Sequence, residues 1–285
     1  MRGIVTRIQS NLYTVKLEDK KVIECTAKGL LKYKKMSILV GDMVEVNTNN
    51  NVIEKVLPRK NEFIRPPIAN VDQLIIVVAA TNPTPDLMLL DKQLVMAEKN
   101  GVEPVICINK IDLEADYSEI IEVYENIGYQ VITTTAKNGI GIDKIARILG
   151  NKITAFSGNS GVGKSALTNN IFNEEVSKEG ETSDKLKKGK HTTKHVELFD
   201  FSENSYIADT PGFSSFDVDG INYKELDKYF IEFAPFAQEC EFRSCTHIKE
   251  LNCGVKKAVA KRKIDKGRYE RYTLLFEKMK GDKKW

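Results

Sequence analysis

The sequence predicts an α/β protein in which a domain with a largely parallel sheet follows a small β-barrel and precedes a helical, metal-binding domain. Apolar and polar residues alternate from 3 to 56, and continuous apolar runs alternate with helical segments from 71 to 158. Three cysteines and a histidine cluster between 240 and 253. We therefore place domains at 1–62, 63–220 and 221–285, which suits a length of 285 residues.

The composition is that of a folded globular protein, with 41% hydrophobic and 29% charged residues. No apolar run approaches the roughly 20 residues that span a bilayer. The start, MRGIVTRIQSN, has no apolar h-region, so we expect no signal peptide and a cytoplasmic location. Because cytoplasmic cysteines stay reduced, clustered ones are expected to bind metal rather than to form disulfides.

Charge is distributed unevenly along the chain, although the net charge is only +3. Residues 1–65 hold 13 Lys/Arg against 7 Asp/Glu, and residues 254–285 hold 12 against 4. The middle of the chain is acidic, with 18 against 29. Basic ends around an acidic centre predict contact with a polyanion, although a solvated Lys-rich helix would also explain the tail.

The first segment predicts a barrel. Short alternating stretches between turn residues give about five strands in some 60 residues, typical of an OB-type barrel, and an SH3-like barrel would look similar. Residues 28–35, KGLLKYKK, are expected on a basic loop. Residues 57–70 predict a linker without strand pairing, because Pro58, Pro66 and Pro67 interrupt regular ladders.

The central segment predicts a doubly covered sheet, because its strands are apolar throughout. The expected strands are 71–80, 103–110, 129–136, 152–158, 195–201 and 205–210, and the expected helices are 87–101, 118–128, 141–150 and one that starts at Lys164. Beyond it we expect a helix at 223–233 and one long basic helix from about 255 to 280. Tyr272, Leu275, Phe276 and Met279 would form its apolar stripe.

GNSGVGKS, at 158–165, matches G-x-x-x-x-G-K-[ST] between a predicted strand and a predicted helix. Glycines let backbone N–H groups turn toward phosphate oxygens, and the helix N-terminus adds partial positive charge. Lys164 is expected to reach the β- and γ-phosphates, and Ser165 to bind Mg²⁺. The predicted contacts are Gly158, Asn159, Ser160, Gly161, Val162, Gly163, Lys164, Ser165 and Ala166.

DTPG, at 209–212, ends a predicted strand. Asp209 would hold Mg²⁺ through water, and Gly212 would offer its N–H to a γ-phosphate. A plain Asp-containing turn would explain these residues if they stood alone. Beside a phosphate loop we favour the nucleotide interpretation.

NKID, at 109–112, predicts guanine specificity. Asp112 is placed to accept hydrogen bonds from N1–H and the exocyclic amine of guanine, a donor pair that adenine lacks. TTAK, at 134–137, ends the next strand and would face guanine O6 with a backbone N–H. The predicted base contacts are Asn109 at the purine edge, Lys110 along the base and against the phosphate loop, Asp112, Thr135, Ala136 and Lys137.

HTTK, at 191–194, predicts a switch loop. Thr193, favoured over Thr192, would bind Mg²⁺ and sense the γ-phosphate. Many GTPases position water with a Gln after the DxxG glycine, but Phe213 stands there and cannot polarise water. His191 would supply that group, so the predicted catalytic residues are His191, Lys164 and Thr193. A solvated loop histidine is the alternative.

Cys240, Cys245, His247 and Cys253 give C-x₄-C-x-H-x₅-C. Three thiolates and an imidazole suit a closed tetrahedral zinc site, which implies a structural metal. Cys25 and Cys107 each stand alone in a predicted strand and are expected to be packed, inert thiols.

The motifs stand in a rotated order. Usual P-loop GTPases run from the phosphate loop through the switch Thr and DxxG to NKxD and SAK, whereas this chain runs NKID, TTAK, GNSGVGKS, HTT, DTPG. A parallel sheet whose termini lie close can be joined there and cut elsewhere. We therefore predict a circularly permuted P-loop GTPase domain between an OB-fold and a helical zinc-binding domain.

This motif order, with the Cys/His spacing, closely resembles the RsgA family, bacterial GTPases of small-ribosomal-subunit maturation, over essentially the whole chain. The resemblance implies that the OB-fold contacts ribosomal RNA and that the zinc domain docks on the subunit. It also implies GTP hydrolysis that is slow alone and faster on the subunit, with His191 positioning water. Lys194 departs from the third Thr that often follows HTT.

We therefore expect a Mg²⁺-dependent GTPase that binds the small subunit late in maturation and leaves it on hydrolysis. The alternative is a nucleotide-gated rRNA-binding factor whose hydrolysis is incidental. The expected ligands are GTP or GDP, Mg²⁺ and one Zn²⁺. Nothing in the sequence indicates an oligomer seam, so we expect a monomer.

Overall fold

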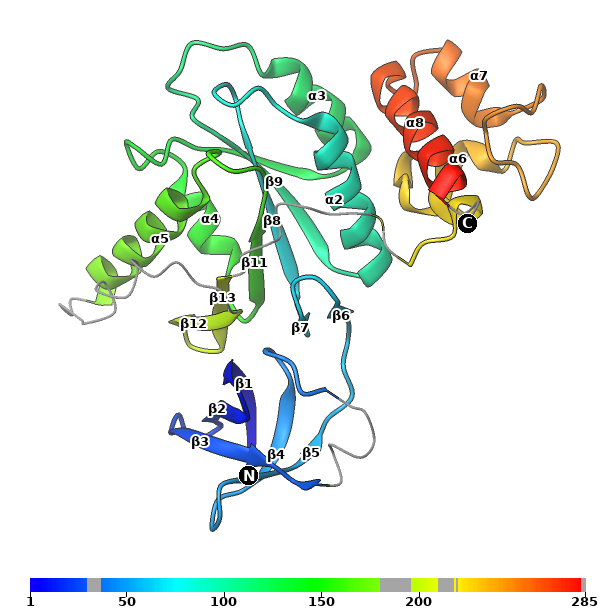
Figure 1. Cartoon of the computed structure of the whole chain (residues 1–285). Helices are drawn as coiled ribbons and strands as arrows, with labels where there is room; N and C mark the ends of the chain where they lie inside the picture. The colour runs from blue at the N-terminus through cyan, green and yellow to red at the C-terminus, as the bar shows by residue number, and fades with distance from the viewer. Residues whose placement is uncertain (30–36, 180–195, 210–217, 219, 283–285) are drawn as a thin grey trace.

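Residues 2–56 form a five-stranded barrel in the computed structural model, which describes residues 1–29, 37–179, 196–209, 218 and 220–282 (Figure 1). The barrel closes because β1 pairs with both β2 and β4, while β5 pairs with β4 and β3. Alternate side chains point inward, so Val5, Val15 and Ile53 are fully buried. This confirms the predicted barrel. The strands are β1 (Arg2–Gln9), β2 (Leu12–Leu17), β3 (Val22–Ala27), β4 (Met43–Asn47) and β5 (Val52–Val56).

A short hairpin corrects the prediction that residues 57–70 lack strand pairing. β6 (Glu62–Phe63) pairs with β7 (Ile68–Ala69). Pro66 and Pro67 lie in the turn between the two strands, so neither has to donate an N–H to the ladder. The domain boundary expected between 62 and 63 falls inside β6.

The central sheet has the order β10-β9-β8-β11-β13-β12 and is parallel except for β12. Every residue of β8 and β11 is buried, which explains their continuous apolar sequences. The predicted, largely parallel sheet is therefore confirmed. Its strands are β8 (Gln73–Ala79), β9 (Glu103–Asn109), β10 (Gln130–Thr133), β11 (Ile153–Ser157), β12 (Glu197–Ser202) and β13 (Ser205–Asp209).

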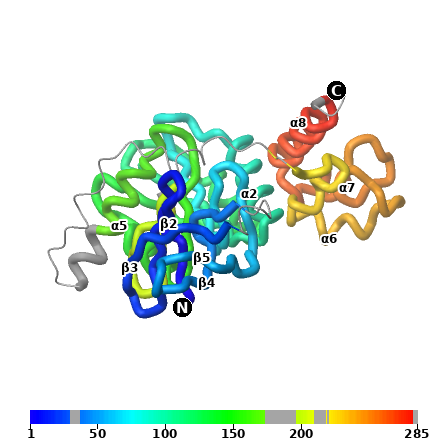
Figure 2. Tube along the Cα trace, turned by 60° about the horizontal axis from the view of Figure 1, so that its bottom comes forward, coloured from blue at the N-terminus to red at the C-terminus, as the bar shows by residue number. Residues whose placement is uncertain are grey.

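Helices cover both faces of this sheet. α2 (Leu87–Asn100) and α3 (Ser118–Ile127) share a core with Ile76 and Val78 of β8. α4 (Ile142–Ile148) and α5 (Lys164–Glu179) share another with Ile75 and Val77, the alternate residues of the same strand. Figures 1 and 2 both place α5 and the C-terminal helix α8 on opposite sides of the domain, with α2 beside α8.

The C-terminal segment differs from the prediction in two places. Residues 223–233 form two 3₁₀ helices, η2 (Tyr223–Tyr229) and η3 (Ile231–Phe233), instead of one α-helix. The expected long helix is divided into α7 (Gly254–Ala260) and α8 (Lys266–Asp282), with the short α6 (Ala234–Ala237) earlier in the chain.

The break between α7 and α8 has a local cause. Arg262 adopts a positive φ of 56°, and the N–H of Lys263 bonds back to the carbonyl of Ala258, which ends α7. Asp265 then caps α8 by accepting the N–H of Arg268 at 2.7 Å. The predicted stripe of Tyr272, Leu275, Phe276 and Met279 is confirmed, because all four are buried.

Within the described part of the chain, none of the helices combines the length and apolar character that crossing a membrane requires.

Candidate nucleotide and metal sites

The predicted phosphate loop connects β11 to α5. Gly158, Gly161 and Gly163 have φ angles of 133°, 80° and 100°, which residues with a Cβ rarely adopt. A Cβ on Gly158 would lie 2.1 Å from the carbonyl oxygen of Val77, and one on Gly163 would lie 2.3 Å from Nδ2 of Asn109. Glycine is therefore required here for close approach to β8 and β9, whatever the loop binds.

Lys164 begins α5 and folds back over this loop. Its Nζ donates to the carbonyl oxygens of Gly158 and Asn159 at 2.7 and 2.9 Å. Burial lowers the pKa of Lys164. Ser160, Ser165 and Ala166 are exposed, whereas the side chain of Val162 is packed in the core. The ammonium group is thus held within the loop, at the N-terminus of a helix.

Asn109 joins the three predicted nucleotide loops and is almost completely buried. Its Nδ2 donates to the carbonyl of Val162 at 2.8 Å. Its Oδ1 accepts from the hydroxyl of Thr134 and the N–H of Ala136, both at 3.1 Å. One amide therefore fixes 109–112, 134–137 and 158–165 relative to one another, and its contact with a purine stays a prediction.

Lys110 and Asp112 follow at the end of β9. Lys110 has a φ of 65°. Its ammonium donates to the carbonyl of Asn82, whereas the sequence predicted a contact with the phosphate loop. The neighbouring Pro83 lies against Gly161, where an added Cβ would be 3.9 Å from Pro83 Cδ. Asp112 is exposed, so its carboxylate is accessible to a ligand.

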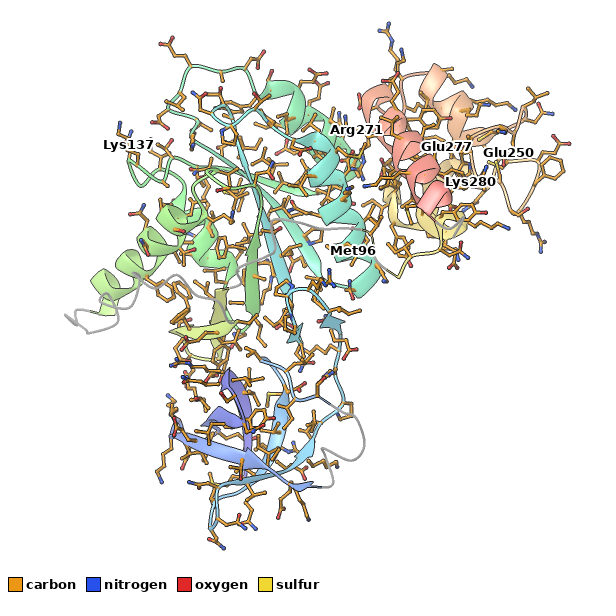
Figure 3. The ribbon with its side chains drawn as sticks, in the orientation of Figure 1. Met96, Lys137, Glu250, Arg271, Glu277 and Lys280 are labelled. Carbon is orange, nitrogen blue, oxygen red and sulfur yellow. The ribbon has the colours of Figure 1, made fainter. Side chains whose placement is uncertain are left out.

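The loop after β10 carries the remaining predicted base contacts. Thr135 and Ala136 are buried, whereas Lys137 is exposed and extends from the loop (Figure 3). The hydroxyl of Thr135 is buried and has no hydrogen-bond partner within the described residues. Asn170 of α5 donates to the carbonyl of Ala136, which ties this loop to the helix that follows the phosphate loop.

The other predicted switch and magnesium residues are only partly described. His191, Thr193 and Gly212 lie outside the described residues, and of Asp209 only the backbone is described. β13 runs parallel to β11, with Ala208 beside Ala155, so Asp209 ends its strand at the same edge of the sheet as the phosphate loop. The roles of these four residues stay predictions.

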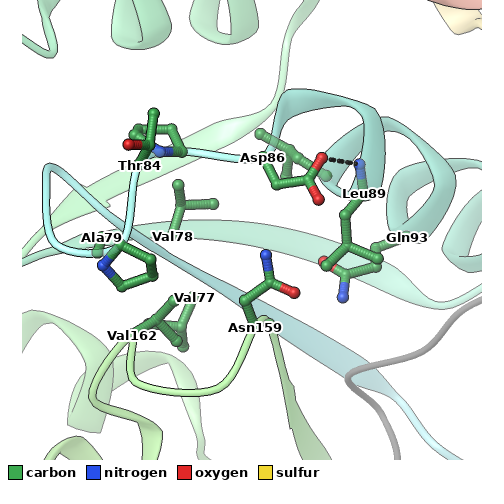
Figure 4. Close-up of a pocket in the computed structure, with 13 residues that line it drawn as sticks. Val77, Val78, Ala79, Thr84, Asp86, Leu89, Gln93, Asn159 and Val162 are labelled. Atoms are coloured by element: carbon green, nitrogen blue, oxygen red, sulfur yellow. Dashed lines mark hydrogen bonds between the residues drawn. The ribbon is translucent and has the colours of Figure 1, made fainter.

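A small pocket beside the phosphate loop includes a segment that sequence reasoning missed. Asn159 and Val162 line it from the loop, and Thr84, Asp86 and Gln93 line it from residues 83–93 (Figure 4). Asp86 caps α2 by accepting the N–H of Leu89 at 2.9 Å. The sequence signal was TNPTPD, two prolines and an N-capping Asp directly before a helix.

The Cys₃His residues converge as the spacing predicted. Their four ligand atoms lie within 4.8 Å of one another. His247 Nδ1 is 3.3 Å from Sγ of Cys253 and 3.6 Å from Sγ of Cys240. Such spacing fits one ion held at about 2.0–2.3 Å from each ligand, and the donor set suits zinc.

Polar groups surround this cluster. His247 Nε2 lies 3.7 Å from Asp227 Oδ2 on η2, the type of carboxylate that orients a metal-binding imidazole. Glu250 accepts two hydrogen bonds from Thr246 and one each from the N–H groups of Ile248 and Lys249. Burial acts to raise the pKa of Glu250, but these donors outweigh it and lower the pKa to about 2. Hydrogen bonds to Glu250 therefore fix the backbone on both sides of His247.

The two isolated cysteines match their prediction. Cys25 and Cys107 are buried and unpaired. Burial raises the pKa of Cys107 to about 12, which keeps this thiol protonated and unreactive.

Comparison with known proteins places most of the chain in one family. A family model described as RsgA GTPase matches residues 56–219, and one described as RsgA N-terminal domain matches residues 2–53. A relative from Alkaliphilus metalliredigens, named small ribosomal subunit biogenesis GTPase RsgA, is 42% identical and 94% of each chain is covered. A relative of the same name from Caldanaerobacter subterraneus is also 42% identical, with coverage of 100% and 97%.

Two solved structures resemble this chain over nearly its full length. YjeQ from Thermotoga maritima has a TM-score of 0.85 and 38% identity, with 98% of each chain covered. YloQ, described as a circularly permuted GTPase, has a TM-score of 0.84 and 34% identity, covering 100% of this chain and 96% of its own. The predicted permuted fold is therefore confirmed.

Proposed function

The chain belongs to the RsgA family of circularly permuted GTPases, and we propose that it hydrolyses GTP on the small ribosomal subunit during late maturation and leaves on hydrolysis. The observation that carries this proposal is the convergence of three motif loops on Asn109 at one edge of the sheet. Whole-length relatives named small ribosomal subunit biogenesis GTPase support the biological setting.

Hydrolysis is a matter of positioning and electrostatics. Lys164 and the N–H groups of residues 158–165 bind the phosphates and oppose the charge that develops during transfer. His191 positions the attacking water from the switch loop. Ser165, Thr193 and, through water, Asp209 would hold Mg²⁺, which when bound supplies further positive charge to the phosphates.

Guanine is selected at the neighbouring loops. Asp112 accepts from the two guanine donors, and Lys110 and Lys137 lie along the base. Thr135 and Ala136 border the O6 side. The buried hydroxyl of Thr135 supports this arrangement, because within the described residues it lacks a partner.

The two ends of the chain bind the subunit. The barrel contacts rRNA, and the C-terminal domain, held together by one structural Zn²⁺ at Cys240, Cys245, His247 and Cys253, docks beside it. The exposed Lys257, Lys261, Arg262, Lys263 and Lys266 at the α7–α8 turn support contact with RNA phosphates. The protein works as a monomer in the cytoplasm, where small subunits are assembled.

Co-sedimentation with purified small subunits tests this proposal. We expect retention with a non-hydrolysable GTP analogue, release with GDP, and a steep loss of affinity between about 50 and 200 mM salt. Equal retention with both nucleotides would contradict hydrolysis-coupled release, and a salt-independent affinity would contradict binding through phosphates.

A further inference from the structure

Helix α2 is buried on two opposite sides. Asp91 and Gln93 are two positions apart on the helix, so their side chains point in nearly opposite directions. Both are nevertheless buried, with 0% and 1% of their surface exposed. One side packs on β8, and the other contacts η2 and α8 of the C-terminal domain. α2 thus lies between the nucleotide domain and the Cys₃His domain, as Figure 1 shows.

Gln93 links α2 to the phosphate loop. Its Nε2 donates to the hydroxyl of Ser157 at 2.7 Å, and both side chains are buried. Ser157 immediately precedes Gly158, the first residue of the loop, and Gln93 borders the same pocket as Asn159 (Figure 4). A buried hydrogen bond therefore joins α2 to the residue directly before the phosphate loop.

Asp91 links α2 to the C-terminal domain. Its two carboxylate oxygens accept from Arg268 and Arg271 of α8, and the hydroxyl of Tyr124 donates to it as well. Arg268 is fully buried and also donates to Glu232 of η3. Arg271 lies where α8 meets α2 and α3 (Figure 3). Sliding of α8 along α2 would separate Arg268 and Arg271 from Asp91, and separating buried charges from their partners is costly.

α8 in turn holds the Cys₃His loop. The hydroxyl of Tyr269 donates to the carbonyl of His247 at 2.7 Å, and that of Tyr272 donates to the carbonyl of Thr246 at 2.6 Å. Hydrogen bonds and two helices thus form a continuous chain from the phosphate loop to a metal ligand.

We propose that α2 and α8 form a relay that couples nucleotide occupancy of the phosphate loop to the placement of the Cys₃His domain, with Gln93 and Asp91 as positioning residues. This rests on the proposed function, because a guanine nucleotide must occupy residues 158–165. The relay does not use the stretch of chain that runs from Gly212 to the 223–233 segment. That stretch includes residues outside the described part of the chain. Coupling of this kind is reciprocal, so changes in α8 must alter nucleotide binding.

Hydrogen exchange of the full-length protein tests one direction. Binding of GDP should slow amide exchange in α8 by about threefold or more, a change beyond the scatter of uncoupled sites. Gln93→Met should abolish this response while GDP still protects residues 158–165. Slowed exchange in the loop with no change in α8 of the unaltered protein would overturn the relay, and this comparison needs no variant to fold.

Dissociation of a fluorescent GDP analogue tests the reverse direction. Arg271→Met should accelerate dissociation about fivefold or more while zinc content stays at one per chain. Arg147→Met is the matched control, because Arg147 forms an exposed pair with Asp143 on α4, across the sheet. Equal rates for both variants would overturn the relay. A protein that binds no GDP at all would instead overturn the proposed function.

Discussion

Arg7 of β1 and Glu197 of β12 are register partners, and through this pair the barrel and the central sheet form one continuous sheet. On its other side, Glu197 is the partner of Asp209, the predicted magnesium carboxylate. β12 begins at Glu197, three positions after the last of the predicted switch residues 191–194. The barrel is thus attached to a strand that lies between the two predicted γ-phosphate-sensing segments, 191–194 and 209–212.

Lys16→Met should weaken this attachment. Lys16 of the barrel donates to Asp200 of β12 at 2.6 Å and lies 5.2 Å from the ring centre of Tyr206. Losing both contacts should cost about 1 kcal/mol locally and speed hydrogen exchange in β12. Lys21→Met is the control. It removes an exposed ion pair between two residues of the barrel domain, Lys21 and Asp19, and should leave hydrogen exchange in β12 unchanged. The same exchange in both variants would show that the barrel is held mainly by its backbone.

Asp112→Asn should change base preference. An amide cannot accept both guanine donors, so GDP affinity should fall roughly tenfold to a hundredfold, whereas xanthosine diphosphate gains a donor for its O2. Titration of the variant and of the unaltered protein with both nucleotides measures the ratio of the two affinities. An unchanged preference for guanine would remove Asp112 from the base site.

His191→Ala should slow hydrolysis about 100-fold or more and leave GTP affinity unchanged, because a water-positioning group acts only in the reaction. Single-turnover hydrolysis and equilibrium binding separate the two effects. If affinity fell instead, His191 would have a structural role in the switch loop.

Removal of the metal should unfold the C-terminal loop and leave the nucleotide site intact. Cys253→Ser should abolish bound zinc, and Asp227→Asn should weaken zinc affinity about 10- to 100-fold by releasing the imidazole of His247. Zinc content and chelator competition measure both effects, with Cys25→Ala as the control that retains zinc. Full zinc content in Cys253→Ser would exclude the proposed ligand set.

The nucleotide loops could be predicted because their spacing records local backbone geometry. Glycines at 158, 161 and 163 meet the need for positive φ angles, which is a property of each residue in its own turn. The Cys₃His cluster was equally predictable, because its ligands lie within 14 consecutive residues, 240–253.

Long-range contacts could not be predicted in the same way. Gln93 and Ser157 are 64 positions apart, and Asp91 and Arg268 are 177 apart, so no local pattern announces either pair. The break between α7 and α8 is local, but it was not predicted because Lys261, Arg262 and Lys263 are ordinary helix-forming residues. Strands of only two residues, such as β6 and β7, are too short to produce a periodic pattern of apolar residues.

Steady-state GTP turnover with and without purified small ribosomal subunits tests the central claim most directly. We predict that saturating subunits raise the turnover rate several-fold, and that His191→Ala abolishes this stimulation. An identical rate with and without subunits, at concentrations where binding is demonstrated, would contradict the account and favour a nucleotide-gated RNA-binding factor.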